Sequence, residues 1–155
     1  MVDLYERVNV LVKQDRTVYR CDDYLSPSVQ RKLKEQCLMN ELPKMPTCGS
    51  VSSSSSSSSG INEVWREKIC EWSYQVVDHF EFSREVVGIS MSFLDRYLCT
   101  RPVDKKLFQL AATTTLYLAI KIYEPGNFSM ASMIELSRGY FMVEQIAVME
   151  MAILQ

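Results

Sequence analysis

The sequence predicts an all-α protein whose main body begins after Gly60. Apolar residues recur every three or four positions along five successive segments, which is the period of an amphipathic helix. Capping and turn residues separate each segment from the next. Nowhere after Gly60 do apolar and polar residues alternate as they do in a strand. We therefore expect a bundle of five helices around a central apolar helix, preceded by shorter helices.

Residues 1–48 are predicted to form an N-terminal extension with two short helices. Apolar residues at helical spacing place the first over residues 3–15. Ser26 followed by Pro27 has the form of an N-cap and a first helical residue, so a second helix should run from Ser28 to about Met39. The apolar positions of the first helix are Leu4, Val8, Leu11 and Val12.

Residues 49–60 are predicted to be a flexible linker. They contain eight consecutive serines, Ser52 to Ser59, closed by Gly60. Such a segment buries too little apolar surface to offset the entropy of ordering it. The linker separates the extension from a body that we place at residues 61–155.

The first two helices of the body have clear start signals. Asn62 is expected to cap the first, and Ser83 to cap the second, which should end at the turn formed by residues 100–102. The apolar stripe of the first helix is Trp65, Ile69, Trp72, Val76 and Phe80, at steps of three and four.

The third helix should begin after the cap Asp104 and run from Lys105 to about Tyr123. It is apolar on nearly every side, which is typical of a helix at the centre of a bundle. Its longest charge-free run, Leu107 to Ile120, has 14 residues. A membrane span needs about 20, so we interpret it as a core helix of a soluble protein.

Two further helices complete the predicted body. The fourth should begin after Ser129 and finish at Gly139, and the fifth should begin near Val143. The fifth reaches Gln155 without a C-cap signal. We therefore expect a fragment, or a domain whose partner lies beyond the last residue.

Composition excludes several classes of function. A net charge of −2 argues against a nucleic-acid partner, which needs a surplus of Lys and Arg. The five cysteines form no CxxC pair and His79 is the only histidine, so we predict neither a metal site nor a disulfide framework, but reduced thiols in the nucleus or cytoplasm. No glycine-rich phosphate loop is present. We expect no cofactor and no catalysis.

Four charged residues occupy positions where the helical pattern expects apolar ones. Arg66 and Asp95 each lie among apolar neighbours, and burying either charge alone would cost several kcal/mol, so we expect them to pair. Lys121 and Glu150 pose the same problem. They are expected either to meet or to line a surface that receives another protein.

Several segments of the body match the motifs of one family in order and spacing. Residues 65–72, WREKICEW, resemble the opening motif MRxxLxxW of cyclins, and residues 93–98, FLDRYL, resemble its yxDRfL. Residues 107–110 and 118–124 resemble LQL and LAsKyEE, and residues 149–150 match the closing mE. The departures from the pattern resemble divergent cyclins of diatoms and related algae.

The resemblance implies an N-terminal cyclin box at residues 61–155, with the second cyclin fold absent. It implies a regulatory subunit that docks on the C-helix of a cyclin-dependent protein kinase, activates it, and so controls cell-cycle progression in the nucleus and cytoplasm. A cyclin-fold transcription factor or adaptor that binds DNA or transcription proteins is the alternative, and the acidic balance of the body argues against it.

The resemblance also assigns site residues. Arg66 and Asp95 match the family's buried structural ion pair. Lys121 and Glu150 match the pair that hydrogen-bonds the kinase backbone. The alternative is an intramolecular salt bridge that only braces the third and fifth helices of the body, and the two roles are compatible. Apolar contacts to the kinase would come from Leu118, Ile122 and Leu154, for which core packing is the alternative.

A substrate-docking patch is only partly retained. Ile69, Trp72 and Gln109 match it, whereas Trp65 stands where methionine is usual. Gln75 replaces the acidic residue that recognises basic docking peptides, which puts that recognition in doubt. The alternative for Trp65, Ile69 and Trp72 is that they belong to the core.

Overall fold

The computed structural model describes residues 4–39, 61–124, 126 and 128–155, and in these ranges every regular element is a helix. The predicted all-α class is confirmed. The predicted linker at residues 49–60 lies outside the described residues. The helices are α1 (Leu4–Thr17), α2 (Pro27–Met39), α3 (Glu63–His79), α4 (Glu85–Leu98), α5 (Lys105–Tyr123), α6 (Met130–Leu136) and α7 (Val143–Ile153).

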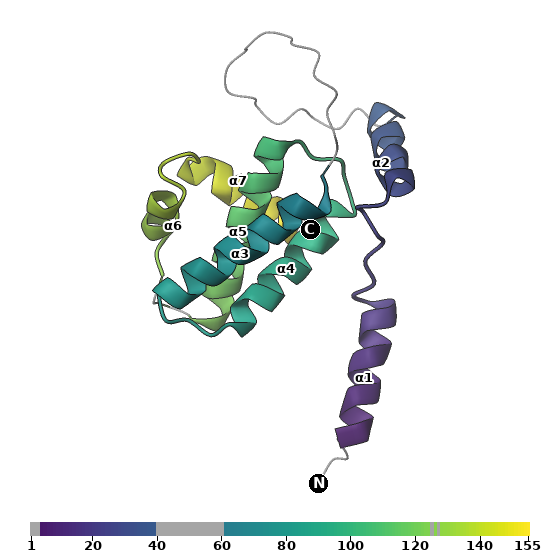
Figure 1. The fold of residues 1–155 in the computed structure, drawn as a ribbon, viewed down its shortest axis with the longest axis horizontal. Helices are drawn as coiled ribbons and strands as arrows, with labels where there is room; N and C mark the ends of the chain where they lie inside the picture. The colour runs from purple at the N-terminus through teal and green to yellow at the C-terminus, as the bar shows by residue number, and fades with distance from the viewer. Residues whose placement is uncertain (1–3, 40–60, 125, 127) are drawn as a thin grey trace.

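Helix α5 lies at the centre of the bundle, as its all-round apolar sequence predicts (Figure 1). Every residue from Leu110 to Ile120 is buried. The helix packs most extensively against α4, then against α7, and also contacts α3 and α6. Within the described ranges, no helix combines the length and the apolar character that crossing a bilayer requires.

Three of the predicted N-caps are present. The Asn62 side chain accepts a hydrogen bond from the Trp65 N–H at 3.1 Å, and the Asp104 carboxylate accepts one from the Leu107 N–H at 2.7 Å. Ser129 accepts from the Ser132 N–H at 3.1 Å. Each cap satisfies one of the backbone donors that a helix leaves unpaired in its first turn.

The start of α4 and the end of α6 differ from the predictions. Arg84, not Ser83, occupies the N-cap position of α4, with helical dihedral angles and no side-chain cap bond. The Ser83 hydroxyl nevertheless accepts a hydrogen bond from the Glu85 N–H at 3.4 Å. Helix α6 ends at Leu136, not at Gly139. In the Schellman motif that follows the helix, both Arg138 (φ 53°) and Gly139 (φ 67°) take the left-handed conformation.

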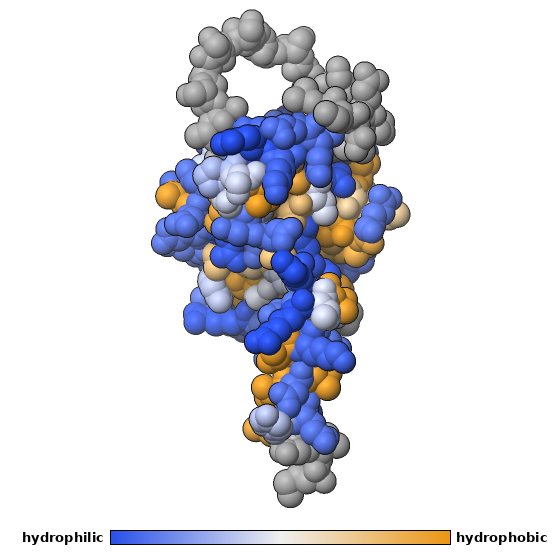
Figure 2. Space-filling model, turned by 90° about the vertical axis from the view of Figure 1, so that its right-hand side faces the viewer, coloured by the Kyte–Doolittle hydropathy of each residue, from blue (hydrophilic) through white to orange (hydrophobic). Residues whose placement is uncertain are grey.

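The N-terminal extension meets the body through the segment after α1. No side chain of α1 is buried, and this helix projects away from the bundle (Figure 1). Hydrophobic side chains lie at its surface (Figure 2). By contrast, Tyr24 and Leu33 are buried, and the Gln30 side-chain amide donates to the Ile61 carbonyl at 2.7 Å. Helix α2 therefore contacts the body, whereas α1 buries no side chain on it.

Candidate functional site

Lys121 and Glu150 come together at the C-terminal end of α5, where α7 crosses it. Lys121 Nζ lies 2.8 Å from Glu150 Oε1. The lysine side chain is 55% exposed and the glutamate 16%, so the ammonium faces solvent while the carboxylate is largely covered. The hydrogen bond to Glu150 is the main cause that raises the pKa of Lys121. The pair thus presents a fully charged donor at the surface.

This ion pair contributes little to stability by itself. Exposed pairs contribute about 0–1 kcal/mol, because water screens the attraction and two long side chains lose freedom. An ammonium has three donors, and Glu150 accepts from one of them. The Lys121 Nζ also lies 5.8 Å from the centroid of the Tyr117 ring.

Apolar side chains are exposed next to this pair. Ile122, which follows Lys121, is 56% exposed, and Leu154, one turn after Glu150, is 59% exposed. Leu118 differs, because it is only 3% exposed. At this exposure it offers little surface to another protein.

Sequence reasoning missed three exposed apolar residues on the same two helices. Tyr123, Val148 and Met151 are 47%, 51% and 61% exposed. The signal was available in α7, where large apolar residues exceed what one buried stripe can hold.

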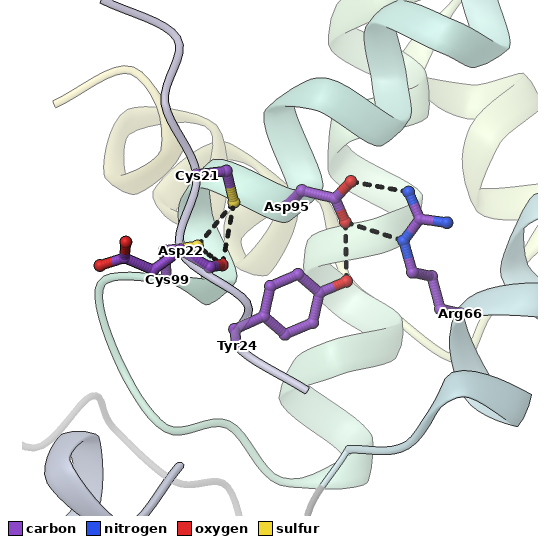
Figure 3. Close-up of polar contacts among 6 residues, drawn as sticks. All are labelled: Cys21, Asp22, Tyr24, Arg66, Asp95 and Cys99. Atoms are coloured by element: carbon purple, nitrogen blue, oxygen red, sulfur yellow. Dashed lines mark hydrogen bonds and ion pairs between the residues drawn. The ribbon is translucent and has the colours of Figure 1, made fainter. Parts of the chain in front are cut away.

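Arg66 and Asp95 form a two-point ion pair between α3 and α4 (Figure 3). Arg66 Nη2 and Nε donate to the two carboxylate oxygens of Asp95 at 2.7 and 3.0 Å. The hydrogen bond to Asp95 is the main cause that raises the pKa of Arg66. We expected a buried pair from the sequence. The two side chains are instead 39% and 21% exposed, so the pair is only half-buried. The reason is its place at the edge of the bundle.

A third member of this cluster was not predicted. The Tyr24 hydroxyl donates to Asp95 Oδ1 at 2.7 Å, although Tyr24 precedes the bundle (Figure 3). Burial, and then this hydrogen bond, raise the pKa of Tyr24. Tyr24 thus attaches the extension to the ion pair. The sequence offers no periodic signal that could reveal such a contact across 71 residues.

A hollow of about 710 Å³ lies where the docking patch is expected. Ile69, Trp72 and Gln109 are among its lining residues. Trp65 is not, since its ring packs 5.8 Å from that of Phe108. The hollow also has apolar walls from Leu136, Tyr140 and Phe141, and its remaining lining includes the cations Lys105, Lys106 and Arg138 but no carboxylate.

Metal binding finds no support in the part of the chain that the structure describes. No three side chains of His, Cys, Asp or Glu come close enough together there to hold an ion.

Comparison with known proteins identifies one family. The family described as "Cyclin, N-terminal domain" matches residues 36–155, more than three quarters of the chain. The match begins before the body predicted from residue 61 and includes the serine run.

Curated relatives include mitotic cyclins of animals and plants. The chain is 32% identical over 95 residues to the G2/mitotic-specific cyclin-B2 of Rana japonica, which covers 61% of this chain and 24% of that protein. It is 31% identical over 94 residues to cyclin-B1-1 of Arabidopsis thaliana, and this match covers 61% of this chain and 22% of that protein. It is 35% identical over 66 residues to the G2/mitotic-specific cyclin-A1 of Caenorhabditis elegans, and this match covers 43% of this chain and 14% of that protein. The chain thus spans about a quarter of the length of these relatives or less.

Proposed function

The chain belongs to the cyclin family and carries its N-terminal domain, and on this premise we propose that it binds and activates a cyclin-dependent protein kinase. The names of two relatives, both called G2/mitotic-specific, support a role in the cell cycle at mitosis. The role is regulatory, and the kinase supplies the catalysis. We propose that the protein acts in the nucleus and cytoplasm, where the kinase meets its substrates.

The Lys121–Glu150 pair carries this proposal. Phosphoryl transfer by a protein kinase requires a glutamate of its C-helix to pair with a lysine of its β3 strand. The Lys121 ammonium would donate to carbonyls beside the C-helix, and Glu150 would accept from an N–H there. Ile122, Met151 and Leu154 would cover the helix with apolar surface.

Activation then follows from differential affinity. A surface that fits the C-helix only in its inward position binds the active kinase more tightly than the inactive one, and so shifts the population toward activity. An ion pair that only braced α5 and α7 would not need exposed apolar neighbours, which favours the docking role over the brace.

The test is a double variant, Lys121→Ala with Glu150→Ala, assayed for co-purification with a cyclin-dependent kinase and for its stimulation. We expect both to fall at least tenfold, because a truncated polar contact in an interface core costs about 1.4 kcal/mol or more. The matched control is Asp78→Ala with Arg84→Ala, which removes an exposed ion pair of 2.9 Å elsewhere. If the two double variants behave alike while both stay folded, this surface does not bind the kinase.

We also propose that the hollow beside Trp72 binds docking segments of kinase substrates. Its apolar wall suits hydrophobic side chains, and its three cations suit acidic rather than basic flanking residues. Two peptides with the same apolar core, one flanked by glutamates and the other by arginines, test whether the hollow prefers acidic or basic flanking residues. We expect the acidic peptide to bind more tightly in fluorescence anisotropy, and equal or reversed affinities would contradict this specificity.

A further inference from the structure

Two cysteines from distant parts of the chain meet beside the Arg66–Asp95 pair. Cys21 lies between α1 and α2, and Cys99 is the C-cap residue of α4. Their sulfurs are 2.7 Å apart, and the Cys99 thiol also donates to the Asp22 carbonyl at 3.1 Å (Figure 3). Both are free thiols. Cys21 is exposed and Cys99 is half-buried.

The contact does not depend on the sulfurs alone. Three residues after Cys21, the Tyr24 ring is 5% exposed and its hydroxyl binds Asp95. Two residues before Cys21, the Tyr19 ring lies 5.7 Å from the Arg96 guanidinium. The segment is therefore held against α4 on both sides of Cys21, which keeps the two thiols at high effective concentration.

From this arrangement we propose that Cys21 and Cys99 are a redox pair, which a peroxide oxidises to an intramolecular disulfide that ties the N-terminal extension to α4. This inference does not depend on the proposed kinase partner. In compartments where thiols are normally kept reduced, such a bond is transient and reports oxidation.

The chemistry takes two steps and is balanced. The Cys21 thiolate attacks one peroxide oxygen, the O–O bond breaks, and Cys21 becomes a sulfenic acid while one water leaves. The Cys99 sulfur then attacks the sulfenic sulfur, the S–O bond breaks, and a second water leaves as the S–S bond forms. Two thiols lose two electrons and two protons, and hydrogen peroxide is reduced to two waters.

Exposure sets the order of the two residues. Cys21 is exposed and meets solvent peroxide first, whereas Cys99 is half-buried and is placed to attack second. Burial raises the pKa of Cys99 to about 12, which slows this second attack at neutral pH. Burial also raises the pKa of Cys21. The hydrogen bond with Cys99 and, more weakly, the charge of Arg66 oppose this rise, whereas the charges of Asp95 and Asp22 add to it. Because the thiolate is the nucleophile, oxidation should be slow at neutral pH and accelerate as pH rises toward and beyond 9.

Among the cysteines whose side chains the structure describes, Cys70 is the competing partner. It lines the same hollow of about 440 Å³ as Cys21, with Arg66 and Asp95. No sulfur contact joins Cys70 to Cys21 among the described residues. The pairing with Cys99 should therefore form first.

The test uses the full chain, fully reduced and then treated with hydrogen peroxide. Intact mass should fall by two hydrogen atoms, and peptide mapping should join the peptides of Cys21 and Cys99. Dithiothreitol should reverse both. Cys70→Ser, the matched control, should oxidise like the original, whereas Cys21→Ser and Cys99→Ser should not form the bond.

Proteolysis supplies an independent measurement. Trypsin cleavage after the exposed Arg20 should slow by about tenfold or more on oxidation, because the disulfide holds the neighbouring segment closed. The melting temperature should rise by on the order of 10 °C. The proposal is overturned if Cys21 and Cys99 stay alkylatable after peroxide treatment of the folded chain, or if Cys21 joins another cysteine instead.

Discussion

At the scale of single residues, Asp95 connects three parts of the molecule through side-chain hydrogen bonds. It accepts two hydrogen bonds from Arg66 and one from Tyr24. The three side chains come from three separate stretches of the chain, so the cluster joins α3, α4 and the extension. Loss of one donor leaves the others in place, whereas loss of the carboxylate leaves both without an acceptor.

Tyr24→Phe isolates the contribution of the extension to this cluster. We expect it to lower the free energy of unfolding by about 1–2 kcal/mol at neutral pH, since a hydrogen bond to a charged acceptor is lost while the ring stays buried. Urea denaturation measures this. Tyr19→Phe is the matched control, because Tyr19 is exposed, and should have almost no effect.

The contribution of Tyr24 to stability should depend on pH, and comparing the original protein with Tyr24→Phe measures this dependence. The pKa of Tyr24 is higher in the folded than in the unfolded state, so its contribution is complete below the unfolded value of about 10 and is lost as pH rises above it. The stability difference between the original and Tyr24→Phe should therefore shrink between pH 9 and pH 11. A difference that grows over this range would contradict the assigned role.

At the scale of elements, helix ends separate what the sequence predicts from what it does not. Periodicity indicates the five helices of the body, and Asn62, Asp104 and Ser129 mark three starts, because a cap acts through local chemistry. Two ends use a non-glycine residue in the left-handed region, Glu81 (φ 57°) and Arg138. There tertiary packing overrides local preference, which no local pattern reveals.

Glu81→Gly should stabilise the protein. Glu81 follows α3 in a Schellman motif. Its neighbours in the sequence, Phe80 and Phe82, stack their rings on each other with centroids 5.7 Å apart. Relief of the left-handed strain outweighs the greater unfolded freedom of glycine, for a net gain of about 0.5–1 kcal/mol. Thermal unfolding should show a rise of about 2–4 °C. Glu81→Ala removes the same charge but keeps Cβ, and should bring no gain.

At the scale of the whole molecule, burial decides which predicted surface residues can act. The all-round apolar sequence of α5 cannot distinguish buried Leu118 from exposed Ile122, because both lie beside Lys121 in the pattern. The contact between Tyr24 and Asp95 was likewise beyond prediction, since a long-range contact from an irregular segment leaves no periodic trace. The extension thus divides into α1, which has no buried side chain, and a segment that packs on the bundle.

Two truncations test this division. Removing residues 1–17 deletes a helix with no buried side chain, so the free energy of unfolding should change by less than about 0.5 kcal/mol. Removing residues 1–26 also deletes the buried Tyr24 and its hydrogen bond to Asp95, and should cost about 2–4 kcal/mol. Urea denaturation of both, beside the full chain, measures the difference. If the two truncated proteins are equally stable, the buried Tyr24 side chain contributes nothing. The segment after α1 would then not hold the extension to the bundle.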